Sequence, residues 1–169
     1  MKSKKNIVLV GMMGSGKSSI GKLLSKKLKL EFIDIDDKIE EKENNTISKI
    51  FNKNGESYFR NLEENVSINN LKLQNKIISL GGGGFINKKI RKQTMTNCIS
   101  IWLSWKQETL INRIKNSKKR PMVIKLGLLK IRELIIYRSK IYNLSDFKIN
   151  CDNLDKNQIV NKIVNFYEI

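Results

Sequence analysis

Short apolar runs alternate with longer amphipathic stretches along the 169 residues of the chain. An unbroken apolar run is typical of a parallel strand buried on both faces, and apolar residues three or four apart are typical of a helix. Because the two patterns alternate, they predict an α/β fold, with a parallel sheet covered by helices on both faces. The runs predicted as strands are 6–10, 31–36, 76–80, 98–103 and 147–151.

The helical pattern follows the first strand and the last strand and fills most of the chain between them. Thr46 is placed to cap one helix, which Gly55 is expected to end, because a threonine hydroxyl satisfies free backbone amides and glycine favours helix ends. The intervening helices are predicted over residues 37–43, 46–54, 56–73, 88–96, 107–115 and 126–142.

The segment between the first strand and its helix matches G-x-x-x-x-G-K-[ST], as Gly11-Met12-Met13-Gly14-Ser15-Gly16-Lys17-Ser18. Glycines let backbone amides curl around phosphate oxygens, and the N-terminus of the following helix adds a partial positive charge. Lys17 is expected to reach the β- and γ-phosphates of a nucleotide, and the Ser18 hydroxyl to hold Mg²⁺. A glycine-rich turn that fits the motif by chance is the alternative, and the strand and helix on its two sides argue against it.

Carboxylates stand at the end of the second predicted strand, and in open α/β sheets ligands bind at the carboxyl ends of strands. The third predicted strand ends on Ser79-Leu80, where a P-loop motor ATPase usually carries an acidic residue. We therefore expect the carboxylate on the Mg²⁺ side of the site to come from Asp34.

Four glycines, 81–84, follow the third strand at once. A flexible linker is the alternative, but the run lies between a core strand and a helix, so we expect another group to approach its backbone closely. Residues 116–121 form a dense positive cluster that holds the only proline. This cluster is interpreted as the start of a mobile lid over phosphates, about residues 116–126, with a solvated loop as the alternative.

Arginine is the minor cation in this lysine-rich chain, which indicates positions where a planar fork is needed for a carboxylate, a phosphate or a base. Arg91 and Arg132 are best explained as ordinary surface residues. The other four are Arg60, Arg113, Arg120 and Arg138.

The net charge of +17 raises the possibility of nucleic-acid binding. We expect none, because the charge is mostly lysine spread along the whole chain, with the Asn and Ile content of A/T-rich coding. No run reaches the length of a membrane span, and residues 1–5 lead directly into the first strand without room for a signal peptide. Cys98 and Cys151 lie in apolar segments and are expected to be reduced core residues of a cytoplasmic protein.

Taken in order, these motifs resemble those of the shikimate kinases over nearly the whole chain. The matching features are the P-loop, Asp34-Ile35-Asp36, Phe59-Arg60 with Glu63-Glu64, Gly81-Gly82-Gly83, Arg120-Pro121 and Arg138 with Tyr142. The resemblance implies a P-loop kinase of the nucleoside-monophosphate kinase-like fold, a three-layer α/β/α sandwich with strand order 2-3-1-4-5. It implies one domain over residues 1–169, with substrate-binding helices at about 35–73. The implied reaction phosphorylates the 3-hydroxyl of shikimate with ATP, on the route to chorismate and the aromatic amino acids.

The resemblance also implies the roles of single residues. Asp36 holds the ring hydroxyls of shikimate beside the accepting oxygen, and Arg60 and Arg138 bind its carboxylate. The shikimate site is completed by the backbone amide of Gly82, with Gly81 and Gly83 beside it. Lys17, Asp36 and Arg120 are the implied catalytic residues, with Mg²⁺ held by Ser18 and, through water, by Asp34. The implied ATP site comprises Gly14, Ser15, Gly16, Lys17, Ser18, Ser19, Arg113 stacked on adenine, and Arg120.

Two departures from the family pattern stand out. Met122-Val123 follows the lid proline where leucines are common, and Lys156 occupies the place of a proline in the adenine loop, 153–157. Three other functions are weighed beside this one: a gluconate kinase-like enzyme, a binding protein that has lost catalysis, and a nucleic-acid-binding NTPase. The intact Lys17, Ser18, Asp34 and Asp36 argue against lost catalysis. We expect a monomer that binds shikimate and ATP, and neither nucleic acid nor membrane.

Overall fold

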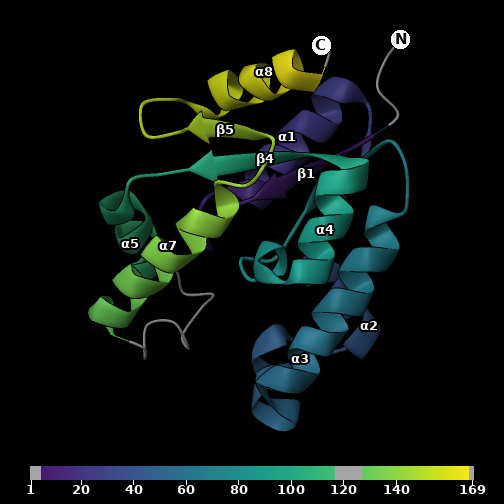
Figure 1. Cartoon of the computed structure of the whole chain (residues 1–169), viewed down its shortest axis with the longest axis vertical. Helices are drawn as coiled ribbons and strands as arrows, with labels where there is room; N and C mark the ends of the chain where they lie inside the picture. Colours follow the sequence, from purple (N-terminus) through teal and green to yellow (C-terminus); the bar gives the residue numbers. More distant parts are fainter. Residues whose placement is uncertain (1–4, 117–126, 168–169) are drawn as a thin grey trace.

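The computed structural model describes residues 5–116 and 127–167. Within these residues, one parallel sheet has the strand order β2-β3-β1-β4-β5, which confirms the predicted α/β fold and its order (Figure 1). Strand β1 lies at the centre, where Ile7 faces Ile77 on one side and Ile99 on the other. The strands are β1 (Asn6–Val10), β2 (Glu31–Asp34), β3 (Lys76–Ser79), β4 (Cys98–Ser104) and β5 (Phe147–Asn150).

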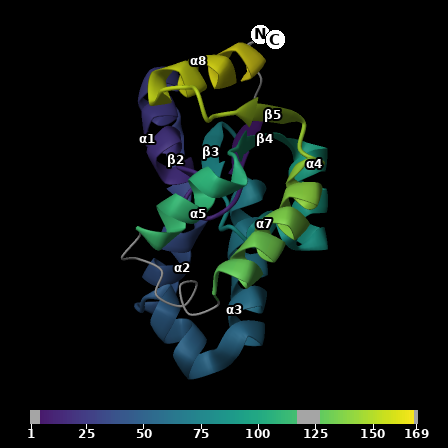
Figure 2. The same cartoon turned by 90° about the vertical axis from the view of Figure 1, so that its left-hand side faces the viewer.

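Helices cover both faces of this sheet. Helices α1 and α8 lie together on one face, and α3, α4 and α7 lie on the other (Figures 1 and 2). Helices α2 and α3 pack on each other and extend beyond the sheet. The helices are α1 (Lys17–Leu28), α2 (Ile35–Glu43), α3 (Ile47–Leu71), the 3₁₀ turn η1 (Gly84–Ile86), α4 (Lys88–Asn97), α5 (Gln107–Lys115), α7 (Leu128–Tyr142) and α8 (Lys156–Tyr167).

Burial of β1 on both faces explains its unbroken apolar sequence. Ile7 and Leu9 belong to the core beneath α1 and α8, whereas Val8 and Val10 belong to the core beneath the other layer. Successive side chains of a strand point to opposite faces, so a central strand needs an apolar residue at every position. Among residues 5–116 and 127–167, no helix combines the length and the apolar character needed to cross a membrane.

The end of the second predicted strand needs correction, whereas the predicted break at Gly55 is confirmed. The second strand ends at Asp34 and not at Asp36, because the Asp34 carboxylate accepts the backbone amide of Asp36 at 3.1 Å and caps α2. The element α3 is capped by Thr46 as predicted, and its first helical segment ends at Gly55 as predicted, because the backbone there is not helical. Gly55 has φ 83°, a conformation that favours glycine, so the chain turns at this point before the helix resumes.

The two cysteines are free and buried, as predicted. Burial raises the pKa of the Cys98 thiol to about 11 and that of the Cys151 thiol to about 12. Neither thiol therefore forms a thiolate near neutral pH, and both act as small core side chains.

Candidate active site

The P-loop connects the central strand to α1 and places the start of this helix at the carboxyl edge of the sheet. Its glycines at 11, 14 and 16 have φ of 146°, 78° and 88°, which side chains rarely allow. Gly16 stands at the helix N-cap, and no side chain caps the first amides of α1. These amides and the positive end of the helix favour an anion at this point.

Lys17 lies buried under the loop that precedes it. Its Nζ donates to the carbonyl oxygens of Gly11 at 2.9 Å and Met12 at 3.1 Å, and 8% of the residue is exposed. A buried ammonium needs such partners, because removing a charge from water is costly. The lysine is therefore held in place at the loop before any nucleotide arrives.

Ser18 and Asp34 meet beside the P-loop. The Ser18 hydroxyl donates to Asp34 Oδ2 at 2.5 Å, while Asp34 Oδ1 caps α2. A hydroxyl and a carboxylate side by side are the oxygen ligands that Mg²⁺ prefers. In the described part of the chain, no three His, Cys, Asp or Glu side chains gather at one point. The pair fits an ion that takes most of its ligands from phosphates and water.

Two carboxylates converge on Gly81, immediately after β3. A Cβ at this position would lie 2.7 Å from both Asp36 Oδ1 and Glu63 Oε1, so a larger residue would displace these carboxylates. Asp34 at the end of β2 lies opposite Ser79 in β3, and this pairing brings the first turn of α2 beside the glycine run. The predicted close approach to the glycine backbone is confirmed, and the approaching groups are charged.

Two arginines lie beside the next glycines, one in ordinary contact and one much closer. A Cβ at Gly82 would lie 3.4 Å from Nη1 of Arg138, and a Cβ at Gly83 would collide with the guanidinium of Arg60. Arg60 comes from α3, Arg138 from α7 and Asp36 from α2, so three helices deliver charged groups to one turn. The structure thus brings together the side chains that the sequence assigned to a shikimate site.

Glu63 holds Arg60 in place. Its carboxylate pairs with Arg60 at 2.7 Å and is nearly inaccessible to water, and Glu56 forms a second, more exposed pair at 3.3 Å. Burial alone would lower the pKa of the Arg60 guanidinium, but the two glutamates outweigh burial and raise it. Sequence reasoning named Glu63 only as part of a motif and missed its burial.

The glycine turn is also tied to α7. The Tyr142 hydroxyl donates to the carbonyl oxygen of Gly82 at 2.5 Å, and Tyr142 itself is buried against Trp102. Arg138 lies one helical turn earlier, with Nη1 3.9 Å from the Met12 sulfur of the P-loop. Helix α7 therefore connects the glycine turn with the phosphate loop.

The residue predicted to stack on adenine, Arg113, lies beside Gly14 of the P-loop, whereas Arg138 lies beside Met12. Arg113 on α5 donates to the carbonyl oxygen of Gly14 at 3.4 Å and covers the ring of Trp105, which sequence reasoning did not single out. Asp152 accepts the backbone amide of Lys106 at 2.7 Å and so fixes the loop after β5 to α5. A cavity of about 380 Å³ opens here, lined by Ser104, Trp105, Lys106, Asn150, Asp152, Asn153 and Leu154.

The remaining arginines are elsewhere. Arg91 donates to the backbone carbonyls of Phe85 and Ile86, and Arg132 pairs with Glu108 at 2.6 Å on the surface. Arg120 and the predicted lid from residue 117 to residue 126 lie outside the described residues.

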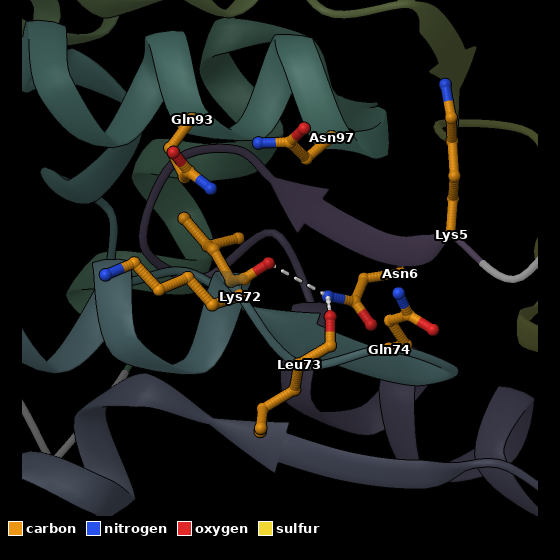
Figure 3. Close-up of a pocket in the computed structure, with 8 residues that line it drawn as sticks. Lys5, Asn6, Lys72, Leu73, Gln74, Gln93 and Asn97 are labelled. Atoms are coloured by element: carbon orange, nitrogen blue, oxygen red, sulfur yellow. Dashed lines mark hydrogen bonds between the residues drawn. The ribbon is translucent and has the colours of Figure 1, made fainter.

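A second cavity, of about 340 Å³, lies at the amino ends of the strands and contains none of the predicted site residues. Figure 3 shows its wall, where the Asn6 amide donates to the carbonyl oxygens of Leu71 at 3.2 Å and Leu73 at 2.6 Å. The Asn6 side chain thus satisfies backbone carbonyl groups at the end of α3.

Known proteins resemble this chain in both sequence and fold. The family model described as Shikimate kinase matches residues 13–168. A shikimate kinase from a Sulfurihydrogenibium species is 41% identical over 160 residues, covering 95% of this chain and 96% of the relative. The structure of a shikimate kinase from Acinetobacter baumannii in complex with shikimate has a TM-score of 0.89 and 29% identity, covering 98% of this chain and 93% of that one. The shikimate kinase structure from Aquifex aeolicus has a TM-score of 0.85 and 34% identity, with 94% of each chain covered. The family predicted from the motifs is confirmed, and the chain belongs to the shikimate kinase family.

Proposed function

We propose that this protein transfers the γ-phosphoryl group of ATP to the 3-hydroxyl of shikimate, giving shikimate 3-phosphate and ADP on the route to chorismate. The observation that carries the proposal is the convergence of Asp36, Arg60 and Arg138 on the glycine turn beside the P-loop. Two guanidinium forks suit a carboxylate, and a carboxylate oxygen suits the hydroxyls of a cyclic polyol. Shikimate carries both kinds of group.

Each charged group has a distinct task in this proposal. Arg60 and Arg138 hold the substrate carboxylate and fix the orientation of the ring. Asp36 accepts a hydrogen bond from the attacking hydroxyl and receives its proton, while backbone amides of the glycine turn, at Gly81, Gly82 and Gly83, donate to substrate oxygens. This arrangement makes the attack effectively intramolecular, because both reactants are held in one geometry.

The phosphate chemistry belongs to the P-loop. Lys17 supports the transferring phosphoryl group, and the amides at Gly14, Ser15, Gly16 and Ser19 surround the phosphates, with Arg113 against the adenine. Mg²⁺ fits the oxygens of Ser18 and, through water, Asp34, and when bound it neutralises charge on the phosphates. Arg120 and a lid over residues 116–126 remain predictions, as does the single domain over 1–169.

A coupled assay of ADP release decides among the candidate functions. The substrate panel contains shikimate, quinate, gluconate and nucleoside monophosphates. We expect turnover with shikimate that requires Mg²⁺ and ATP. Turnover with gluconate or a nucleotide alone would replace the proposal with a different small-molecule kinase, and no turnover with any substrate would favour a binding protein.

Nucleic-acid binding is tested separately. Filter binding across salt concentrations would reveal an NTPase of that class, because neutralising phosphates makes affinity fall steeply with salt. We expect no specific binding. We also propose a monomer that works in the cytoplasm, and light scattering tests the monomer.

Changing Arg60 or Arg138 to lysine is expected to weaken shikimate binding even though the charge remains. A bidentate fork becomes a point charge, and a charge-assisted hydrogen bond contributes roughly 1.5–3 kcal/mol, so KM for shikimate should rise about tenfold or more. Steady-state kinetics and calorimetry measure the change.

Arg132→Lys is the matched control for these two variants, because Arg132 pairs with Glu108 on the surface. It should leave KM for shikimate unchanged. If the Arg60 and Arg138 variants bind shikimate as the unmodified protein does, the carboxylate must bind elsewhere.

A further inference from the structure

Trp105 joins two parts of the nucleotide site that are far apart in the sequence. It follows the last residue of β4, and its indole Nε1 donates to the carbonyl oxygen of Ser15 in the P-loop at 2.9 Å. The guanidinium carbon of Arg113 lies over the indole ring, 3.6 Å from its centroid. This is van der Waals contact between a flat cation and the face of an aromatic ring.

The contact covers one face of the Arg113 guanidinium. Trp105 is itself half-buried, whereas Arg113 as a whole is exposed to solvent. Nη1 of Arg113 also reaches the carbonyl oxygen of Gly14 at 3.4 Å, which further restricts the side chain. The cavity of about 380 Å³ lined by Trp105, Lys106, Asp152 and Asn153 opens beside this pair.

We propose that Trp105 is a positioning residue that holds the Arg113 guanidinium flat as the platform for the purine base of ATP. The inference rests on the proposed function, in which Arg113 stacks on adenine. The order of the stack is indole, guanidinium, purine. An aromatic face and a guanidinium stack well on each other, and a guanidinium stacks in turn on a base.

The physical gain is preorganisation. An exposed arginine samples many rotamers, and ordering it at the moment of binding weakens affinity. Trp105 imposes this order in advance, and its hydrogen bond to Ser15 sets the platform at a fixed position relative to the phosphate loop. A single side chain, that of Trp105, then sets the position of the base relative to the phosphates of the same nucleotide.

Calorimetry with two probes tests this role. ADP carries the base and inorganic tripolyphosphate does not, so only the affinity for ADP depends on the position of the Arg113 guanidinium. Trp105→Leu should weaken the affinity for ADP about tenfold, as expected for loss of a preorganised stacking contact. The affinity for tripolyphosphate should stay within about twofold of that of the unmodified protein. Trp105→Phe keeps an aromatic face and should stay within about threefold of the unmodified protein for both probes. KM for shikimate should not change in either variant.

A double-mutant cycle with Arg113→Ala tests whether Trp105 acts through Arg113. In that background, Trp105→Leu should cost no further ADP affinity. The full tenfold loss there would mean that the indole contacts the base itself, and the proposal would be wrong. Trp102→Phe removes the other tryptophan, which is buried in the core beside Tyr142, and should leave the ratio of the two affinities unchanged.

Two further outcomes would overturn the inference. Equal losses of affinity for ADP and for tripolyphosphate in Trp105→Leu would show that the residue supports the P-loop through Ser15. An unchanged affinity for both probes would show that Trp105 supports neither the P-loop nor Arg113. The assignment of shikimate fails differently. A protein that binds ADP with this dependence on Trp105 but phosphorylates gluconate would refute the substrate and leave the role of Trp105 intact.

Discussion

Lys17→Ala is expected to abolish measurable phosphoryl transfer while the protein stays folded. The Nζ atom of Lys17 is held against the P-loop by the carbonyl oxygens of Gly11 and Met12, at the loop where the proposed function places the phosphates of ATP. Phosphoryl transfer depends mainly on positioning and on stabilising charge in the transition state, and loss of one preorganised donor typically lowers kcat by about 10²–10³-fold. We expect at least this loss, because the lysine carries a full charge.

The measurement is kcat at saturating ATP and shikimate, with circular dichroism and thermal unfolding as checks on the fold. Lys22→Ala is the matched control, since Lys22 is an exposed lysine of the same helix, α1. It should retain normal turnover. A folded Lys17→Ala enzyme with nearly normal kcat would exclude Lys17 from the chemistry.

Asp36→Asn is expected to lower kcat by about 10²–10⁴-fold, the usual range for general acid–base catalysis. The chain contains no histidine, so a carboxylate is the natural acceptor for the proton of the attacking hydroxyl. Asp36 stands in the first turn of α2 with Oδ1 close to the backbone of Gly81, where the proposed function places shikimate. Asparagine keeps the size and part of the hydrogen bonding but cannot accept the proton.

The alternative is that Asp36 only orients the ring and that the proton leaves late, with the phosphoryl group. Asparagine would then be partly competent, and the loss would appear mainly in KM for shikimate. Asp37→Asn controls for the change of charge, because Asp37 is the exposed neighbour on the same turn. A change in kcat of less than about threefold, under roughly 1 kcal/mol of barrier, would end the role as base.

Most of the fold was predictable because its signals are local. The apolar run of β1 and the glycines and lysine of the P-loop follow one another without a gap, and each pattern has one main structural solution. Thr46 was identified as a helix cap for the same reason. The end of the second strand was placed too late because one residue serves two structures: Asp34 both ends the strand and caps the next helix.

The charged side chains that lie at the glycine turn were predictable from the sequence, and the residues that hold them in place were less so. Arg60 and Arg138 were found by their rarity in a lysine-rich chain and by the family motif. The burial of Glu63 beside Arg60 was not, because a glutamate on an amphipathic helix usually faces water. The stacking of Trp105 with Arg113 and its bond to Ser15 depend on contacts between separate elements, which no local pattern encodes.

Asn6 gives this active site a dependence on strand register. Its buried amide donates to the carbonyl oxygens of Leu71 and Leu73, and its Oδ1 accepts the backbone amide of Lys76 at 2.9 Å. All three bonds exist in only one alignment of β1 with β3, and a slip by one residue would also turn the apolar side chains of a strand to the wrong faces. Such a slip would shift the glycine turn relative to the phosphate loop, because the glycine turn follows the end of β3 and the phosphate loop follows the end of β1. The Asn6 side chain, at the edge of the sheet opposite to the active site, therefore helps to set the distance between the glycine turn and the phosphate loop, and with it the distance between the two proposed substrates.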